Sequence, residues 1–247
     1  MEAPDSRSIA SLNLIALLAS VCRSGACALL AYFLAAALAA CSSLPPGQHS
    51  PLVALAEKEE YRPPTVTERQ RLIVQGSRSL EGKKALVVGG VTYPNDCTGL
   101  VRAAYAFASI DLAYRFDEFE GNGVRRLYET LRSQNLVYAV RYPAPADIVF
   151  WNDTYDANGN GKADDELTHV GVVVSAEADG SIVYLHYHYR LGPVLERMNL
   201  LRPDDESRGP DGPVNSILRM RGSPGDAGIN AAQLLSAFGR GYELKIP

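Results

Sequence analysis

One cysteine and three histidines in the body of this chain could together carry out nucleophilic chemistry. Cys97 is the only cysteine after residue 41, and His169, His186 and His188 follow it. A thiol acts as a nucleophile when an imidazole can take its proton and a third group orients that imidazole. The four side chains therefore predict a hydrolytic centre, provided that the intervening elements bring them together.

Cys97 stands at the start of a predicted helix. Turn-forming residues occupy positions 93–95. Apolar residues then recur at helical spacing, at Leu100, Val101, Ala104 and Ala108. A thiol in the first turn lies at the positive end of the helix dipole, which favours a lowered thiol pKa. The alternative is a small buried core residue, the common state of a free cysteine. The polar neighbours Asp96 and Thr98 favour the exposed helix start.

The three histidines fall on a predicted β-hairpin. Residues 169–176 and 181–189 are rich in β-branched and aromatic side chains, and the turn between them contains an Asp-Gly pair. His169 begins its strand, and the far end of an antiparallel partner returns beside it. His186 and His188 both lie in that region and share a face, so the sequence leaves open which of them orients His169.

Simpler explanations compete with this interpretation. His169 could be a surface histidine at a strand end, and His188 could be a cross-strand polar neighbour of the adjacent tyrosines. Cys97 and the three histidines could also bind zinc, although they lack the short paired spacing of structural zinc sites.

A run of oxygen-bearing residues precedes His169. Positions 1, 3, 5, 7 and 9 of a calcium-loop pattern are filled by Asp156, Asn158, Asn160, the carbonyl of Lys162, and Asp164. Position 12 is Leu167 rather than the bidentate glutamate, so the loop is not a complete EF-hand. The alternative is an Asn-Gly turn with solvated carboxylates. We expect a structural Ca²⁺ here and no cofactor for the chemistry itself.

The N-terminal region, residues 1–40, predicts a signal peptide and export. Residues 25–40 carry no charge, follow Arg23 and end in small residues, as cleaved signal peptides do. A spanning helix would need about 20 apolar residues. The end of the segment, Leu38-Ala39-Ala40-Cys41, resembles the lipobox of bacterial lipoproteins, which implies lipidation of Cys41 and anchoring to a membrane. The alternative, an uncleaved anchor, would still place the body outside the cytosol or on a membrane.

The composition and the remaining pattern predict one folded domain. The chain has 247 residues, of which 47% are apolar, and 24 basic residues against 28 acidic ones. Such a chain can bury a core, and the absence of a basic cluster argues against a nucleic-acid partner. Residues 41–65 read as a flexible tether and residues 66–247 as the domain. Within it we expect helices over about 66–75, 124–135 and 230–238, and a strand over 214–220.

Two groups of residues resemble a known family. Gly89-Gly90, Tyr93 and the run Asp96-Cys97-Thr98-Gly99-Leu100 are similar to the signature of the NlpC/P60 cell-wall cysteine peptidases and, more loosely, of their CHAP relatives. The segments 146–151 and 169–172 and His186 continue the similarity. Thr98 replaces the usual serine, and Ala146 replaces a glycine.

The resemblance implies an α+β, papain-like core in which the cysteine-bearing helix packs on an antiparallel sheet. It implies that Cys97 is the nucleophile, His169 the base and His186 the orienting group, with His188 as the alternative. Tyr93 corresponds to a family tyrosine that binds substrate or stabilises the oxyanion.

The same resemblance implies a function and a partner. We expect a lipid-anchored, exported cysteine peptidase that hydrolyses amide bonds in the stem peptides of peptidoglycan. Two alternatives remain open at this point. One is a CHAP-type N-acetylmuramoyl-L-alanine amidase, and the other is a non-catalytic lipoprotein that binds the cell wall.

Overall fold

The computed structural model describes residues 67–139, 142–210, 212–225 and 228–246. The predicted signal peptide, Cys41 and the tether over 41–65 lie outside the described residues. No helix in the described part of the chain is long and apolar enough to cross a bilayer.

The described residues form a mixed α and β structure. Its three α-helices are α4 (Glu68–Leu80), α5 (Cys97–Ala106) and α6 (Gly123–Arg132), and short 3₁₀ turns occur at η1 (Phe116–Glu118) and η2 (Gly241–Glu243). Small two-stranded sheets pair β1 (Leu86–Val88) with β2 (Val91–Tyr93), and β8 (Arg208–Gly209) with β9 (Gly212–Pro213).

A six-stranded sheet forms the centre of the domain, and all its neighbouring strands are antiparallel. Its order is β3 (Val137–Tyr138), β10 (Leu235–Gly239), β4 (Ile148–Trp151), β5 (His169–Ala176), β6 (Ser181–His188) and β7 (Gly192–Asn199). The predicted hairpin is confirmed as β5 and β6, whose register sets Gly171 opposite His186.

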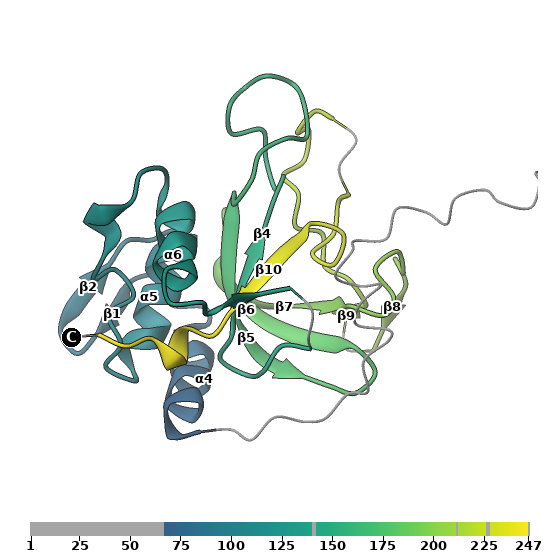
Figure 1. The fold of residues 1–247 in the computed structure, drawn as a ribbon. Coiled ribbons are helices and arrows are strands. Elements are labelled where there is room, and N and C mark those ends of the chain that lie inside the picture. Colours follow the sequence, from purple (N-terminus) through teal and green to yellow (C-terminus); the bar gives the residue numbers. More distant parts are fainter. Residues whose placement is uncertain (1–66, 140–141, 211, 226–227, 247) are drawn as a thin grey trace, which may run out of the picture. The chain divides into compact units, whose positions relative to one another are not determined.

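The two faces of this sheet bury different apolar clusters. Val170 and Val172 of β5 belong to the cluster that contains the buried residues of α4, α5 and α6. Val173 belongs with Trp151 to the second cluster, which residues 231–234 complete on the other face. Figure 1 shows the helices grouped on one side of the sheet, and α5 packs directly on β5 and β6. The alternation of the strand residues therefore decides what each face contacts.

Helix α4 begins where the sequence predicts and continues five residues beyond Gln75. The Thr67 hydroxyl accepts from the Gln70 amide, and the Gln70 side chain accepts from the Thr67 amide, which forms a capping box. Ile73 and Leu80 are buried on its inner face. Packing of that face extends the helix past the expected end.

The start of α5 explains the order of residues around Cys97. The Asp96 carboxylate caps the helix by accepting from the Gly99 amide at 2.7 Å. A Cβ atom on Gly99 would lie only 2.0 Å from the carbonyl oxygen of Pro94. Because the preceding turn touches the helix backbone there, position 99 has no room for a side chain.

Two expectations for the C-terminal part are wrong. Residues 230–238 do not form a helix, because Asn230 is followed by a turn and then by β10, which pairs with both β3 and β4. Residues 214–220 do not form a strand, and only Ile217 makes an isolated bridge, to Asn230. Backbone pairing inside the sheet outweighs the weak helical pattern of a nine-residue segment.

Two unusual residues join the sheet to the preceding loop. Ala146 has a φ of 74°, a left-handed conformation that favours glycine. The fully buried Asp147 carboxylate accepts from the Ala144 amide and from the Tyr138 hydroxyl. Burial nevertheless raises the pKa of Asp147 from 3.8 to about 7, because removal from water penalises the charged form.

This carboxyl makes the stability dependent on pH. Its pKa is higher in the folded chain, so its contribution is complete below pH 3.8 and is lost as the pH rises to about 7. We expect the free energy of unfolding of the wild type to fall, relative to Asp147→Asn, by about 1.4 kcal/mol per pH unit in that window. Urea unfolding of both proteins between pH 4 and 8 measures this change. A difference in free energy of unfolding that does not vary with pH would contradict the prediction.

Candidate active site

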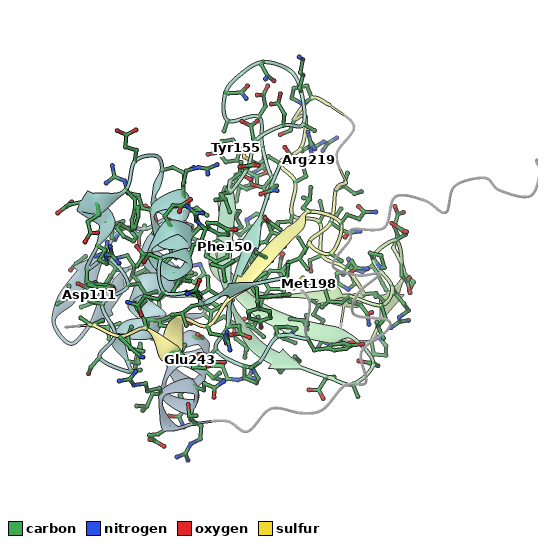
Figure 2. All side chains as sticks on the ribbon, viewed as in Figure 1. Asp111, Phe150, Tyr155, Met198, Arg219 and Glu243 are labelled. Carbon is green, nitrogen blue, oxygen red and sulfur yellow. The ribbon has the colours of Figure 1, made fainter. Side chains whose placement is uncertain are left out.

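A cavity of about 810 Å³ brings the predicted chemical residues together. Cys97, His169, His186 and His188 all line it. Another part of the wall comes from residues 217–223, Gly225 and Ile229, which are distant in sequence. Tyr155 and Arg219, both labelled in Figure 2, line the same cavity. The cavity thus forms where the start of α5 and the ends of β5 and β6 meet the C-terminal segment.

Cys97 is half-buried at the first position of α5. The backbone of Thr98 and that of Val170 lie near enough to the sulfur to act on the thiol pKa, which they lower. Val170 directly follows His169, so the sulfur lies against the beginning of β5. This contact joins the nucleophile's helix to the strand that carries the predicted base.

The thiol pKa differs from the sequence prediction. Burial, and next the adjacent Asp96 carboxylate, raise the pKa of Cys97 from 9.0 to about 11. The expected lowering by the helix dipole is therefore wrong, because desolvation and the charge of the capping residue outweigh it. Cys97 is a neutral thiol at neutral pH, and it needs a base to become a nucleophile.

His186 is the histidine that contacts His169. His169 Nε2 lies 2.9 Å from His186 Nδ1, and the two rings are nearly perpendicular at 83°. His186 is only 2% exposed, whereas His169 is half-buried at the strand end. A Cβ atom on Gly171 would lie 2.7 Å from the carbonyl oxygen of Leu185 and 3.1 Å from the ring of Trp151. Glycine at 171 thus lets the strands and the tryptophan pack beside the two imidazoles.

Glu196 on β7 extends this pair and was not identified from the sequence. Its Oε2 lies 3.1 Å from His186 Nε2, close enough for an ion pair, although the N–H is not aimed well enough for a regular hydrogen bond. The Tyr184 hydroxyl also approaches Oε2, at 3.3 Å. Residues 192–199 were not expected to form a strand. As β7 they pair with β6, which places Glu196 opposite Tyr184 and diagonal to His186.

The order of these groups sets the proton positions. An ionised carboxylate only accepts hydrogen bonds, so Glu196 at 3.1 Å favours the His186 tautomer that carries its proton on Nε2. His186 Nδ1 then accepts from His169 Nε2–H, and His169 Nδ1 remains able to accept a proton. Burial, and the neighbouring His186 and His188, hold the pKa of His169 well below 6.5. His169 is therefore neutral at neutral pH, as a base must be.

His188 lines the cavity but has hydrogen-bond partners of its own, and Tyr93 lies outside the cavity lining. The His188 ring is 6.2 Å from that of His186, and its Nδ1 accepts from the backbone amides of Arg190 and Leu191. Tyr93 is half-buried under the Arg102 guanidinium and is not one of the residues that line the cavity. The structure therefore favours His186 over His188 as the partner of His169 and does not bring Tyr93 to the cavity.

The predicted calcium residues share one loop but bond to protein groups. The Asp156 carboxylate accepts from the amides of Gly159, Asn160 and Gly161. The Asp164 carboxylate accepts from the side chains of Asn158 and Asn160, which lowers its pKa. Among the described residues, no group of three or more His, Cys, Asp or Glu side chains is arranged to hold a metal ion. Calcium binding at Asp156, Asn158, Asn160, Lys162 and Asp164 stays a prediction.

The loop is tied to the start of β5. The Asp153 amide donates to the Asp165 carbonyl, and the Asp165 amide donates to the Asp153 carboxylate. The Thr154 amide and hydroxyl both contact the Thr168 hydroxyl at 2.9 Å. Thr168 immediately precedes His169, so the loop is hydrogen-bonded to the residue next to the predicted base.

This connection makes the calcium prediction testable. If the loop binds Ca²⁺, millimolar CaCl₂ should raise the Tm by several degrees, because a ligand at 100 times its Kd stabilises by about 2.7 kcal/mol. EGTA should reverse the shift, and Asp156→Ala should abolish it, whereas the exposed Asp117→Ala should retain it. Identical melting curves with CaCl₂ and with EGTA would show that the loop binds no calcium.

In comparisons with known proteins, no family model matches this chain, and no curated protein or solved structure matches it.

Proposed function

We propose that this protein is a cysteine peptidase with a papain-like core that hydrolyses amide bonds in peptidoglycan stem peptides. The observation that carries the proposal is the 2.9 Å contact between His169 and His186, in a cavity that Cys97 also lines. Nucleophile, base and orienting group are the three parts that acyl transfer by a thiol requires.

The neutral resting state determines the first step. As the Cys97 sulfur attacks the substrate carbonyl, its proton passes to His169 Nδ1, so charge appears only during the reaction. The buried His186 and the Glu196 carboxylate stabilise the imidazolium that forms. The imidazolium then protonates the leaving amine as the C–N bond breaks, which leaves a thioester on Cys97. Water, deprotonated by the same imidazole, hydrolyses the thioester and restores the thiol.

The choice of peptidoglycan rests on the resemblance described above. The motif residues lie at a helix start and on neighbouring strands, which supports the proposed core: Asp96-Cys97-Thr98-Gly99-Leu100 opens α5, residues 148–151 form β4 and His169 begins β5. The site needs no metal or organic cofactor for this chemistry. We further propose that the protein is exported and attached to a bacterial membrane through a lipid on Cys41.

Loss of the thiol tests the reaction. Cys97→Ala should fold as the wild type does and lower hydrolysis of purified sacculi by roughly a thousandfold or more, because removal of a nucleophile abolishes the covalent route. Cys41→Ala is the matched control and should hydrolyse sacculi normally. Mass spectrometry of the released fragments identifies the bond and separates a peptidase from an amidase. Undiminished cleavage by Cys97→Ala, or none by the wild type, would refute the proposal.

The role of Glu196 gives a second test. The Glu196 carboxylate, 3.1 Å from His186 Nε2, stabilises the imidazolium that forms during the reaction, so Glu196→Gln should lower kcat roughly tenfold or more with little change in KM. Glu177→Gln, on the turn between β5 and β6, is the control and should leave kcat unchanged. Steady-state kinetics on soluble muropeptides measure both, and a wild-type kcat in Glu196→Gln would remove the carboxylate from the mechanism.

A further inference from the structure

His188 lines the active-site cavity without belonging to the chain of His169, His186 and Glu196. It lies two residues after His186 on β6, so both side chains stand on the same face of the sheet. The centroid of its ring lies 6.2 Å from that of His186, further towards the end of β6. An extended substrate that reaches past the reacting thiol would therefore meet His188 next.

The hydrogen-bonding state of His188 is fixed by the β6–β7 turn. Nδ1 accepts from the backbone amides of Arg190 at 3.1 Å and Leu191 at 3.2 Å. A nitrogen that accepts from two amides carries no hydrogen, so the hydrogen of the neutral ring is on Nε2. Within the part of the chain that the structure describes, no group hydrogen-bonds to Nε2.

The ring is also held in orientation. Tyr189 stacks on it at 4.8 Å between centroids with an interplanar angle of 27°, and the Arg190 guanidinium lies over the tyrosine ring, 5.1 Å from its centroid. Desolvation lowers the pKa of His188, Glu196 acts in the opposite direction, and the nearby His186 and Arg190 lower the pKa further. A fixed, neutral ring with one N–H is a preorganised donor.

We propose that His188 is a substrate-binding residue whose Nε2–H donates a hydrogen bond to a carbonyl or carboxylate oxygen of the peptide, next to the scissile amide. The inference rests on the proposed function and adds a recognition point to the same site. The ring recognises an acceptor and not a donor, because its one lone pair is already used by the turn amides. His188 takes no part in proton transfer, so it should affect substrate binding and not the chemical step.

Two substitutions separate this role from support of the turn. In His188→Asn, the amide oxygen replaces Nδ1 as acceptor for the turn, and the Nε2 donor is lost. In His188→Gln, the amide nitrogen reaches the position of Nε2 and restores the donor, while the turn loses its acceptor. Leu191→Ala, at an exposed position of the same turn, keeps both functions and is the control.

The full-length protein and these variants would be compared in hydrolysis of soluble muropeptides. His188→Asn should raise KM roughly three- to tenfold, the effect of one lost hydrogen bond, with kcat within about twofold. The KM of His188→Gln should return most of the way to the wild-type value, and Leu191→Ala should have the KM and kcat of the wild type. Titration calorimetry in the inactive Cys97→Ala background should show the same loss of affinity for His188→Asn. Muropeptides with amidated carboxyl groups distinguish a carboxylate acceptor from a carbonyl acceptor. If His188 binds a carboxylate, His188→Asn should raise KM less on the amidated muropeptides than on the unmodified ones.

The opposite ranking would overturn the inference. If His188→Asn binds like the wild type and His188→Gln is impaired, the ring only supports the turn. A fall in kcat with unchanged KM would place His188 in proton transfer and would also refute the assignment. A wild-type protein that cleaves nothing refutes the proposed function itself, and the role of His188 falls with it.

Discussion

The contact between His169 and His186 is the interaction on which the candidate site depends. It exists because β5 and β6 pair in a register that sets Gly171 opposite His186, so the ring at the strand end meets a ring from the neighbouring strand. Burial of two imidazoles is costly unless their nitrogens find partners. The contact satisfies one nitrogen of each ring, and Glu196 on the third strand lies against the other nitrogen of His186. Three strands must therefore pair correctly before the base has a defined tautomer.

At Cys97, two electrostatic effects compete. The start of α5 offers a positive partial charge, which is worth about 0.3–1 kcal/mol at an ordinary helix terminus. The same helix start is capped by a carboxylate and packed against β5, which removes the sulfur from water. Desolvation penalises the full charge of a thiolate and outweighs this partial charge, so the pKa of Cys97 rises. An enzyme built in this way would keep its thiol protected at rest and activate it only when substrate and base are aligned.

Another part of the cavity wall comes from loops. The Met220 amide donates to the Thr154 carbonyl at 2.7 Å, and a Cβ atom on Gly225 would lie 2.7 Å from the amide nitrogen of Ala163. The segment 217–225 is thus packed on the acidic loop, which in turn precedes His169. Binding or loss of an ion in that loop would act on both the cavity wall and the base through these contacts.

Local signals in the sequence determined the elements and the candidate residues. The capping box at Thr67, the Asp96 cap before Cys97 and the β-branched run after His169 each act within a few residues, so α4, α5 and the hairpin were predictable. The weak helical pattern over 230–238 was also local, and there it misled, because pairing with β3 and β4 depends on residues almost a hundred positions away.

Only the tertiary structure decided the details of the site. The choice of His186 over His188, the presence of Glu196 and the direction of the thiol pKa all depend on strand register and on water exclusion. Register is fixed by packing across the whole sheet, and desolvation by every atom that surrounds a group. Neither quantity is encoded in the few residues next to it, and so the sequence by itself supplied the chemical groups while the fold set their partners and their protonation.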